Sequence, residues 1–337
     1  MKELRTGITI AGTLISDVFY QVESYPKEGL LTNVFGSSIN IGGTGNIILD
    51  LAKLDKNLQI EVCAIVGKDE NGKNLLSTLK NYKNVSIDNV SLGETTSCTI
   101  IMNSAQTKQR TFFFVPGASD VFDISYIDFD KLNTKIFHLE YLLLMKKVDS
   151  YDKDFGTHGA RILYNAQQKG YLTSIDVVSE QSNRAKSIVS CALKYTDICC
   201  INEYEAQSVT DIELVKDGKL DKEKVCLALQ KLSQLGVKKW IVIHSPLESY
   251  GLDVDENKFV RVPSLKISKE YIKGSTGAGD AYCAGILYGA HEDFSLESSM
   301  RLARACSVCS LSQNNGTDGM RSYADTLKIE NQFTELE

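Results

Sequence analysis

The chain has no excess of positive charge: its 337 residues include 37 Lys and Arg against 43 Asp and Glu, giving a net charge of −6. A basic face for nucleic acid is therefore not expected. The chain also has no apolar run of transmembrane length, and its first segment, MKELRTGITIAG, lacks the basic and apolar regions of a secretion signal. These absences predict a cytoplasmic protein that binds neither nucleic acid nor a membrane.

The cysteines form no recognisable disulfide or metal pattern. There are nine of them, an odd number, and they are scattered over a large chain, which favours reduced thiols. Cys306 and Cys309 have metal-ligand spacing but no second pair. Because they lie in a helical pattern, we interpret them as small core residues.

Two common nucleotide-binding motifs are also missing. Residues 67–74, GKDENGKN, resemble a P-loop, but Asn74 stands where the magnesium-binding Ser or Thr belongs. Asp69 and Glu70 would also repel phosphate inside that loop, so we interpret it as a turn between a strand and a helix. No G-x-G-x-x-G motif follows a strand, which disfavours a nicotinamide-dependent oxidoreductase.

Apolar, β-branched runs alternate with helical patterns along most of the chain. We expect strands at 8–15, 60–66, 136–139, 172–177, 196–201 and 239–244, and helices at 45–54, 71–80, 154–168 and 222–235. Repeated strand–helix units predict a parallel sheet with helices on both faces. We therefore expect one α/β domain over residues 1–337.

Two segments break this alternation, at about 17–40 and 97–115. Both have strand-like composition and little helical period. They predict a small β-sheet that projects from the main sheet and closes over a site as a lid. Two ordinary surface hairpins are the alternative, and apolar strands with free edges could also pair two subunits.

The sharpest feature is the sequence GSTGAGD at 274–280, which opens a helical pattern. Gly277 and Gly279 allow a tight turn with an unshielded backbone, so the amides of Ala278, Gly279 and Asp280 can converge on an anion. Asp280, in the first helical turn, is expected to be ionised and to accept a proton from an attacking hydroxyl. A plain helix-start carboxylate is the alternative.

A second candidate site comes from the N-terminal half. Gly42 and Gly43 let a polar ligand approach the backbone, and Asn46 offers both a donor and an acceptor to hydroxyl groups. Asp17, after the first strand, can accept from two adjacent hydroxyls. Taken singly, each of these residues is also typical of a turn or a helix cap.

Asn202 and Glu205 follow the strand at 196–201. Asn202 could cap the next helix. Being three residues apart, the two side chains could also share a helix face and order waters around magnesium, which prefers oxygen ligands.

Together these motifs resemble the PfkB/ribokinase family of carbohydrate kinases over nearly the whole chain. That family has an Asp after its first strand, a Gly-Gly…Asn motif, an Asn-x-x-Glu motif and a late Gly-Ala-Gly-Asp motif, and all four occur here in order. The turn at 66–72 is similar to another family motif, which explains the false P-loop. The resemblance implies a three-layer αβα sandwich with a mostly parallel sheet and a small β lid.

The resemblance also implies roles for individual residues. The sugar would lie under the lid, between Asp17, Gly42, Gly43 and Asn46, with Asp280 as the base. The backbone of 277–279 would hold the transferred phosphoryl group, while Asn202 and Glu205 would position magnesium and the phosphates of ATP. Glu140, after the strand at 136–139, resembles a carboxylate that contacts the sugar, and His244 occupies the place of a loop beside the nucleotide.

The sequence departs from the family pattern in three places. The spacing from Gly42 and Gly43 to Asn46 is one residue shorter than usual, and 244–246 (HSP) replaces a Thr-Leu-Gly type turn. Gly274 stands where the family has an Asp that helps bind a monovalent cation. The resemblance therefore leaves open whether potassium activates the protein.

The predicted function is ATP-dependent phosphorylation of a primary hydroxyl of a free monosaccharide. The stretch 39–46 contains no Lys or Arg, which disfavours a sugar phosphate as substrate. A nucleoside kinase is the close alternative, because Phe112 to Phe114 could stack on a base or could form the lid core. A catalytically idle sugar-binding protein is the alternative from another class.

Overall fold

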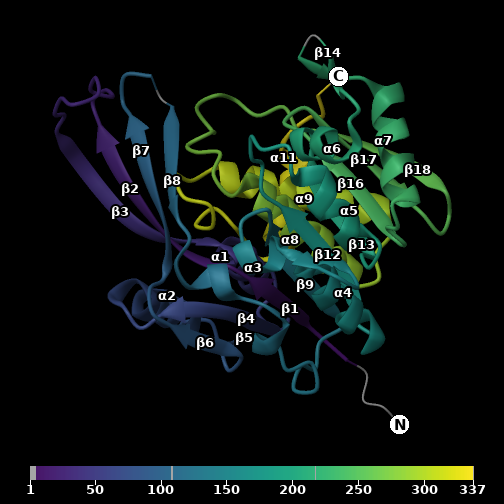
Figure 1. Ribbon diagram of the computed structural model, residues 1–337. Helices are drawn as coiled ribbons and strands as arrows, with labels where there is room; N and C mark the ends of the chain where they lie inside the picture. The colour runs from purple at the N-terminus through teal and green to yellow at the C-terminus, as the bar shows by residue number, and fades with distance from the viewer. Residues whose placement is uncertain (1–4, 108, 217, 337) are drawn as a thin grey trace.

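A mostly parallel sheet forms the centre of the molecule in Figure 1, a computed structural model that describes residues 5–107, 109–216 and 218–336. The strand order is β18-β17-β16-β13-β12-β9-β1-β4-β5, with β6 beside β4, and only the pairs β16–β17 and β17–β18 are antiparallel. The strands are β1 (Ile8–Gly12), β4 (Ile60–Gly67), β5 (Val85–Ser86), β6 (Val90–Gly93), β9 (Ile136–Leu142), β12 (Leu172–Val177), β13 (Ile198–Asn202), β16 (Trp240–His244), β17 (Glu248–Asp253) and β18 (Lys258–Pro263).

Helices cover both faces of this sheet, and each face has its own hydrophobic core. One core contains side chains of α1 (Thr44–Leu54), α2 (Glu70–Lys80), α8 (Ala278–His291) and α9 (Leu296–Leu311). The other contains side chains of α4 (His158–Gln168), α5 (Ala185–Leu193), α6 (Glu203–Thr210) and α7 (Lys222–Gln234). The expected three-layer αβα sandwich is confirmed. No helix in the described ranges has both the length and the apolar character to cross a membrane.

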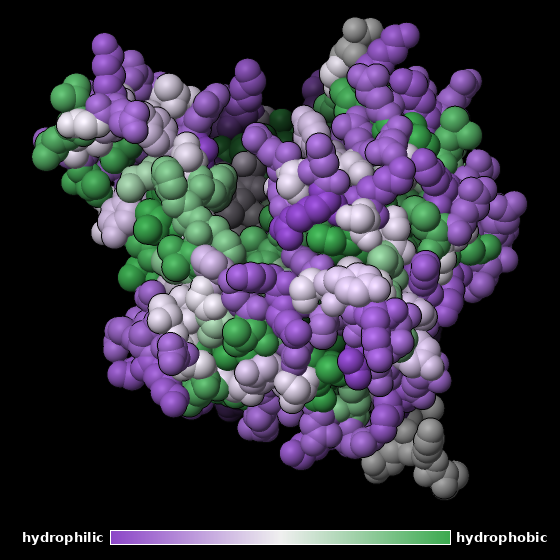
Figure 2. Space-filling model, viewed as in Figure 1, coloured by the Kyte–Doolittle hydropathy of each residue, from purple (hydrophilic) through white to green (hydrophobic). Residues whose placement is uncertain are grey.

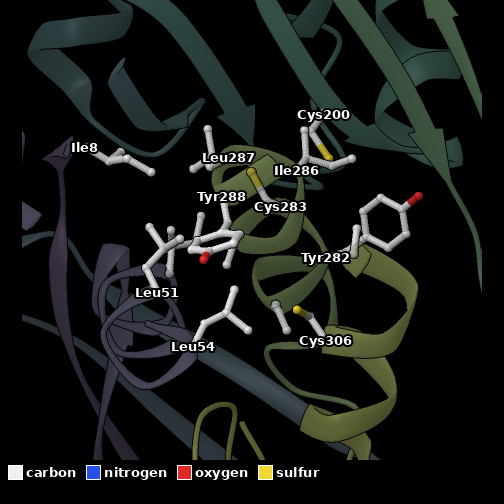
Figure 3. Close-up of a cluster of buried hydrophobic side chains, with 14 of the residues drawn as sticks. Ile8, Leu51, Leu54, Cys200, Tyr282, Cys283, Ile286, Leu287, Tyr288 and Cys306 are labelled. Carbon is white, nitrogen blue, oxygen red and sulfur yellow. The ribbon is translucent and has the colours of Figure 1, made fainter. Parts of the chain in front are cut away.

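Helix α8 is packed in the middle of the first core, as Figure 3 shows. A Cβ added to Gly285 would lie 2.4 Å from the Cα of Ala303, so the α8–α9 contact depends on a residue without a side chain. Cys306 and Cys309 are fully buried free thiols in α9, which confirms that they are core residues. This packing fixes the helix that carries Asp280.

A second, four-stranded sheet, the lid, stands to one side of the main sheet in Figure 1. Its order is β3 (Val34–Gly43), β2 (Leu14–Val22), β7 (Ser97–Ser104) and β8 (Arg110–Val115). Two antiparallel hairpins are joined by the parallel pair β2–β7. Lys108, within the second predicted lid segment, lies outside the described residues.

The strand predicted at 8–15 is two strands, because β1 of the main sheet ends at Gly12 and β2 of the lid begins at Leu14. Gly12 has a φ of 142°, and an added Cβ would lie only 1.4 Å from the carbonyl oxygen of Glu140. Only glycine permits this turn between the two sheets.

The remaining elements are short. They are α3 (Lys146–Asp149), α10 (Tyr323–Leu327), α11 (Ile329–Gln332), β10 (Tyr151–Asp152), β11 (Gly156–Thr157), β14 (Val215–Lys216), β15 (Lys219–Leu220) and two 3₁₀ turns, Gly117–Val121 and Ile124–Tyr126.

Candidate active site

The glycine-rich turn leads directly into α8. Gly277 is the N-cap residue with a φ of 80°, and a Cβ added to it would lie 2.5 Å from the Cα of Gly316. The backbone angle and the close approach both require glycine here. Within the described part of the chain, the amides of Gly279 and Asp280 have no hydrogen-bond acceptor, while that of Ala278 donates a long bond of 3.4 Å to Ser275. Free N–H groups therefore meet the positive end of the helix dipole.

Asp280 is half-buried and hydrogen-bonded through both carboxylate oxygens. Asn46 Nδ2 donates to Oδ2 at 2.7 Å, and the hydroxyl of Tyr141 donates to Oδ1. Burial raises the pKa of Asp280, and the bonds from Tyr141 and Asn46 oppose that rise. The carboxylate is thus held by residues of α1 and β9, which lie far from it in sequence. Asn46 reaches it despite the short spacing from Gly42 and Gly43, and Tyr141 is a residue that the sequence motifs missed.

Asp17 projects from lid strand β2 toward Gly42 of β3. A Cβ added to Gly42 would lie 2.2 Å from Asp17 Oδ2, so Gly42 makes room for this carboxylate. Gly43 has a φ of 60°, and its added Cβ would collide with the carbonyl of Thr13 at 2.2 Å. Burial raises the pKa of Asp17 to about 7, against a lowering hydrogen bond from Thr99. A side chain at Gly42 would therefore clash with Asp17, and one at Gly43 would clash with Thr13, so both positions require glycine.

Glu140 on β9 is fully buried, and neither of its oxygens has a hydrogen-bond partner in the described chain. His138 Nε2 lies 3.8 Å from Glu140 Oε2, but burial lowers the pKa of His138 to about 3 and leaves it neutral. Burial, with the Asp280 charge, raises the pKa of Glu140. Carboxylate oxygens of Glu140, Asp176 and Asp280 lie within 4.8 Å of one another, a donor set of the oxygen type that magnesium prefers.

A cavity of about 580 Å³ opens beside the glycine-rich turn. Ser275, Ala278 and Gly279 line one end of it, and His244 lines its wall. The His244 ring stacks on Tyr282 with centroids 4.9 Å apart, and burial lowers its pKa to about 4, so it is neutral near pH 7. His244 thus contributes an uncharged aromatic ring to the cavity wall, next to the free amides.

Asn202 and Glu205 form a capping box at the start of α6. The Asn202 side chain accepts from the amides of Tyr204 and Glu205, both at 2.9 Å, and Glu205 Oε2 accepts from the Asn202 amide at 2.8 Å. Asn202 Nδ2 also donates to Glu205 Oε1 at 2.7 Å and to Ser179 at 2.9 Å. Burial raises the pKa of Glu205 to about 7. The side-chain amide of Asn202 thus makes hydrogen bonds through both its oxygen and its nitrogen. It could bind solvent or magnesium only if the capping box were disrupted.

Arg110 of lid strand β8 reaches across to the turn, a contact that no sequence motif indicated. Its Nη1 donates to Thr276 Oγ1, and its Nη2 would lie 3.2 Å from a Cβ added to Gly274. An acidic side chain at 274 would thus meet a guanidinium of the chain itself. This contact connects the lid to the loop that precedes Asp280.

Phe112 and Phe113 do not form a lid core, which was one of the two roles predicted for residues 112–114. Phe112 is 57% and Phe113 52% exposed. Because successive strand residues face opposite sides, Phe112 shares the face of Arg110, and Phe113 lies on the other face. Thr99 and Ile101, which share the face of Phe112, are buried, so the exposure on that face is local to the edge strand.

The sequence profile of the pfkB family carbohydrate kinases matches residues 6–322. The chain belongs to this family. PfkB kinases are phosphotransferases that act on sugars. The matched residues include all four motifs described in the sequence analysis.

Individual PfkB relatives are distant in sequence and close in fold. A ribokinase of Lactococcus lactis subsp. lactis (strain IL1403) is 24% identical over 332 residues, covering 95% of each chain. The structure of Arabidopsis thaliana ribokinase complexed with ribose and ATP is similar with a TM-score of 0.79 and 20% identity, covering 96% of this chain and 98% of that one. The structure of a Methanocaldococcus jannaschii nucleoside kinase is similar with a TM-score of 0.72 and 18% identity, covering 96% of this chain and 97% of that one. At these identities the structural likeness shows the ribokinase fold and leaves the substrate open.

Proposed function

We propose that this PfkB protein phosphorylates a primary hydroxyl of a free monosaccharide with ATP, using Asp280 as the general base. The observation that carries the proposal is the junction at the start of α8. There, a carboxylate oriented by Asn46 and Tyr141 lies beside the free amides of the turn and a cavity of about 580 Å³.

In this reaction the sugar hydroxyl would give its proton to the Asp280 carboxylate as its oxygen bonds to the γ-phosphorus of ATP. The bond from that phosphorus to the bridging oxygen breaks, and ADP leaves. The amides of Gly279 and Asp280 would hold the charge on the transferring group. A loose phosphoryl transition state needs positioning more than base strength, and both oxygens of Asp280 are already held.

The nucleotide would occupy the cavity beside His244, with its phosphates toward Gly279. Asp176 offers a carboxylate oxygen for magnesium, and Glu205 extends this acidic group toward the capping box. Bound magnesium would neutralise the charge that develops on the phosphates. Asn202 would contribute by keeping Glu205 in place.

The sugar would lie between Asp17 and Asp280, under the lid. Both carboxylates are hydrogen-bond acceptors for hydroxyl groups, and Glu140 has two acceptor oxygens without partners. A sugar supplies the matching donors, while a sugar phosphate would add negative charge beside three carboxylates. This arrangement favours a neutral polyhydroxyl substrate.

A nucleoside kinase is the second candidate. It is favoured by Phe112, which is exposed on the same face of the lid as Arg110 and could stack on a base.

The lid also has the surface expected of a contact between two copies of the chain. On the face opposite Asp17, an apolar row crosses all four strands through Ile39, Val18, Ile100 and Phe113, which are paired neighbours in register. Figure 2 shows hydrophobic residues gathered on the lid and a recess between the lid and the main body. We propose a homodimer through the lid.

One panel assay tests the proposed function. Free monosaccharides and nucleosides are scored for ADP release with magnesium, with and without potassium. We expect turnover with at least one monosaccharide and no requirement for potassium, because Arg110 stands beside Gly274. Turnover with nucleosides alone would favour the second candidate, and no ADP release with either class would contradict both.

A further inference from the structure

One wall of the 580 Å³ cavity is supplied by a short segment far from the glycine-rich turn. Residues 334–336, here called the strap, run antiparallel to residues 264–266. Lys266 N donates to Thr334 O at 2.7 Å, and Leu336 N donates to Ser264 O at 2.8 Å. Leu265 pairs with Glu335 between these bonds. Leu336 and Leu265 both line the cavity.

A buried arginine anchors the strap. Arg304 of α9 is only 4% exposed and also lines the cavity. Its Nη1 donates to Glu335 at 2.8 Å and to the carbonyl of Pro263, and its Nε donates to Glu330 at 3.0 Å. A buried guanidinium with its donors satisfied holds its partners in one geometry, because breaking any of these bonds would strand a charge.

The chain that leads into the strap is also fixed. Ile329 of α11 is fully buried, and the Phe333 ring packs edge-on against Tyr271 with centroids 5.3 Å apart. The strap therefore continues an ordered segment on the main body, and its position beside the cavity does not depend on the lid.

The strap end of the cavity is apolar, unlike the end at Gly279. Three polar side chains on the cavity wall already have protein partners: Ser307 Oγ donates to Ala278 O at 2.7 Å, Ser249 Oγ to Val262 O at 3.2 Å, and Arg304 is paired as above. Apart from Ser264, the lining side chains near the strap are aliphatic, namely Leu265, Ile267, Val308, Leu311 and Leu336. Such a surface suits the faces of a planar base and offers little to phosphates.

We propose that the strap is part of the nucleotide site, with Leu336 packing against the base and Arg304 acting as the positioning residue. This inference rests on the proposed function, since it takes the cavity to hold ATP. It assigns nucleotide affinity to a segment that none of the four family motifs includes. In this proposal the lid covers the sugar site, and the strap lines part of the nucleotide site.

The test measures binding of a non-hydrolysable ATP analogue with magnesium by calorimetry, together with the KM for the sugar. Leu336→Ala is compared with Leu327→Ala, a matched change at a leucine of α10 that is 38% exposed and does not line the cavity. We expect Leu336→Ala to raise the Kd of the analogue about five- to tenfold, with the sugar KM within about twofold of the unchanged protein. Leu327→Ala should leave both unchanged.

Glu335→Ala supplies the readout for positioning, because it releases the strap from Arg304 without altering the cavity surface. We expect a rise of about threefold in the Kd of the analogue and again no change in the sugar KM. Unchanged nucleotide binding in Leu336→Ala would overturn the inference. So would a parallel loss of sugar and nucleotide affinity with a lowered Tm, which would assign the strap a purely structural role. An unaltered protein that fails to bind the analogue would contradict the proposed function itself, and the inference with it.

Discussion

The two sides of Asp280 are built in opposite ways. On the side proposed to bind the nucleotide, polar side chains are paired with one another: Asn202 and Glu205 form a capping box, and Arg304 is paired with Glu330 and Glu335. On the sugar side, carboxylates are buried with few partners. Glu140 is fully buried with both oxygens unpaired in the described chain, and burial raises its pKa.

This difference has an energetic meaning. A buried carboxyl without donors costs stability, most of all when it is ionised. The donors that the sugar side lacks are those that a polyhydroxyl ligand brings, so binding would remove part of a cost already present in the free protein. The nucleotide side has no such deficit, and its fixed features are amides and apolar walls. Substitutions on one side at a time should therefore have separable effects.

Among variants that alter only one of the two sides, the largest effect is expected from Gly277→Ala, which disrupts the nucleotide side. A side chain at φ 80° and 2.5 Å from Gly316 must displace the turn, so kcat should fall on the order of a thousandfold as the amides leave their positions. Steady-state kinetics measure this fall. Gly170→Ala is the matched control, because Gly170 has a φ of 82° with nothing within 4 Å of an added Cβ. Equal activity in the two variants would show that the turn does not hold the phosphoryl group.

Glu205→Gln separates folding from magnesium chemistry. Glutamine keeps one acceptor oxygen for the backbone amide of Asn202 but turns its own NH2 group toward Asn202 Nδ2, so the Tm should fall modestly. The loss of one carboxylate from the acidic group should lower kcat on the order of fiftyfold and raise the magnesium concentration needed for half-maximal rate. A magnesium titration at fixed ATP measures both. An unchanged magnesium dependence would reduce Glu205 to a capping residue.

Asp17→Asn breaks the sugar side and should raise the sugar KM about thirtyfold, because charge-assisted bonds to hydroxyls are lost. Stability should move the other way. The folded pKa of about 7 lies above the ordinary 3.8, so the native state binds the extra proton between these values and loses stability as pH rises through them. At about pH 8 the variant should be more stable by roughly 4 kcal/mol, a gain that vanishes near pH 4.

Denaturant unfolding at the two pH values checks this sign, with the exposed Asp255→Asn as control. The same ionisation predicts that kcat/KM for the sugar falls as the pH drops below about 7. A stability gain of equal size at both pH values would contradict the burial argument.

The smallest effect is expected from Arg110→Ala, which cuts the contact between the lid and the turn. We expect kcat/KM for the sugar to fall about tenfold, because the lid loses its bond to Thr276 while both sites remain intact. Arg261→Ala, which removes an exposed ion pair on β18, serves as the control. A loss confined to the nucleotide KM would place Arg110 with the nucleotide side instead.

The parts that the sequence predicted well are those determined by local residues. β12 was placed residue for residue and α1 within one residue, because apolar periods and flanking turns are local signals. The glycine-rich turn could be predicted because its glycines are required by the local backbone conformation. By contrast, α9 is predicted only as a helical pattern around Cys306 and Cys309, without bounds, because buried Ser299, Arg304 and Ser310 interrupt its apolar period.

The contacts that complete the site could not be read in this way. Tyr141 follows a predicted site residue, yet its bond to Asp280 spans 139 positions and depends on how β9 ends beside α8. Arg110 reaches Thr276 across 166 positions, through a lid whose tilt no local pattern encodes. The one-residue shortening before Asn46 looked like a defect in the motif, but in the fold Asn46 still bonds to Asp280.

The most direct measurement pairs turnover with binding in Asp280→Asn. The account predicts that kcat falls by about three orders of magnitude or more, while the Kd values for the sugar and for a non-hydrolysable ATP analogue stay within about threefold. Such a split would show that the carboxylate acts on the proton and not on the fit of either substrate. Undiminished turnover in this variant would contradict the account at its centre.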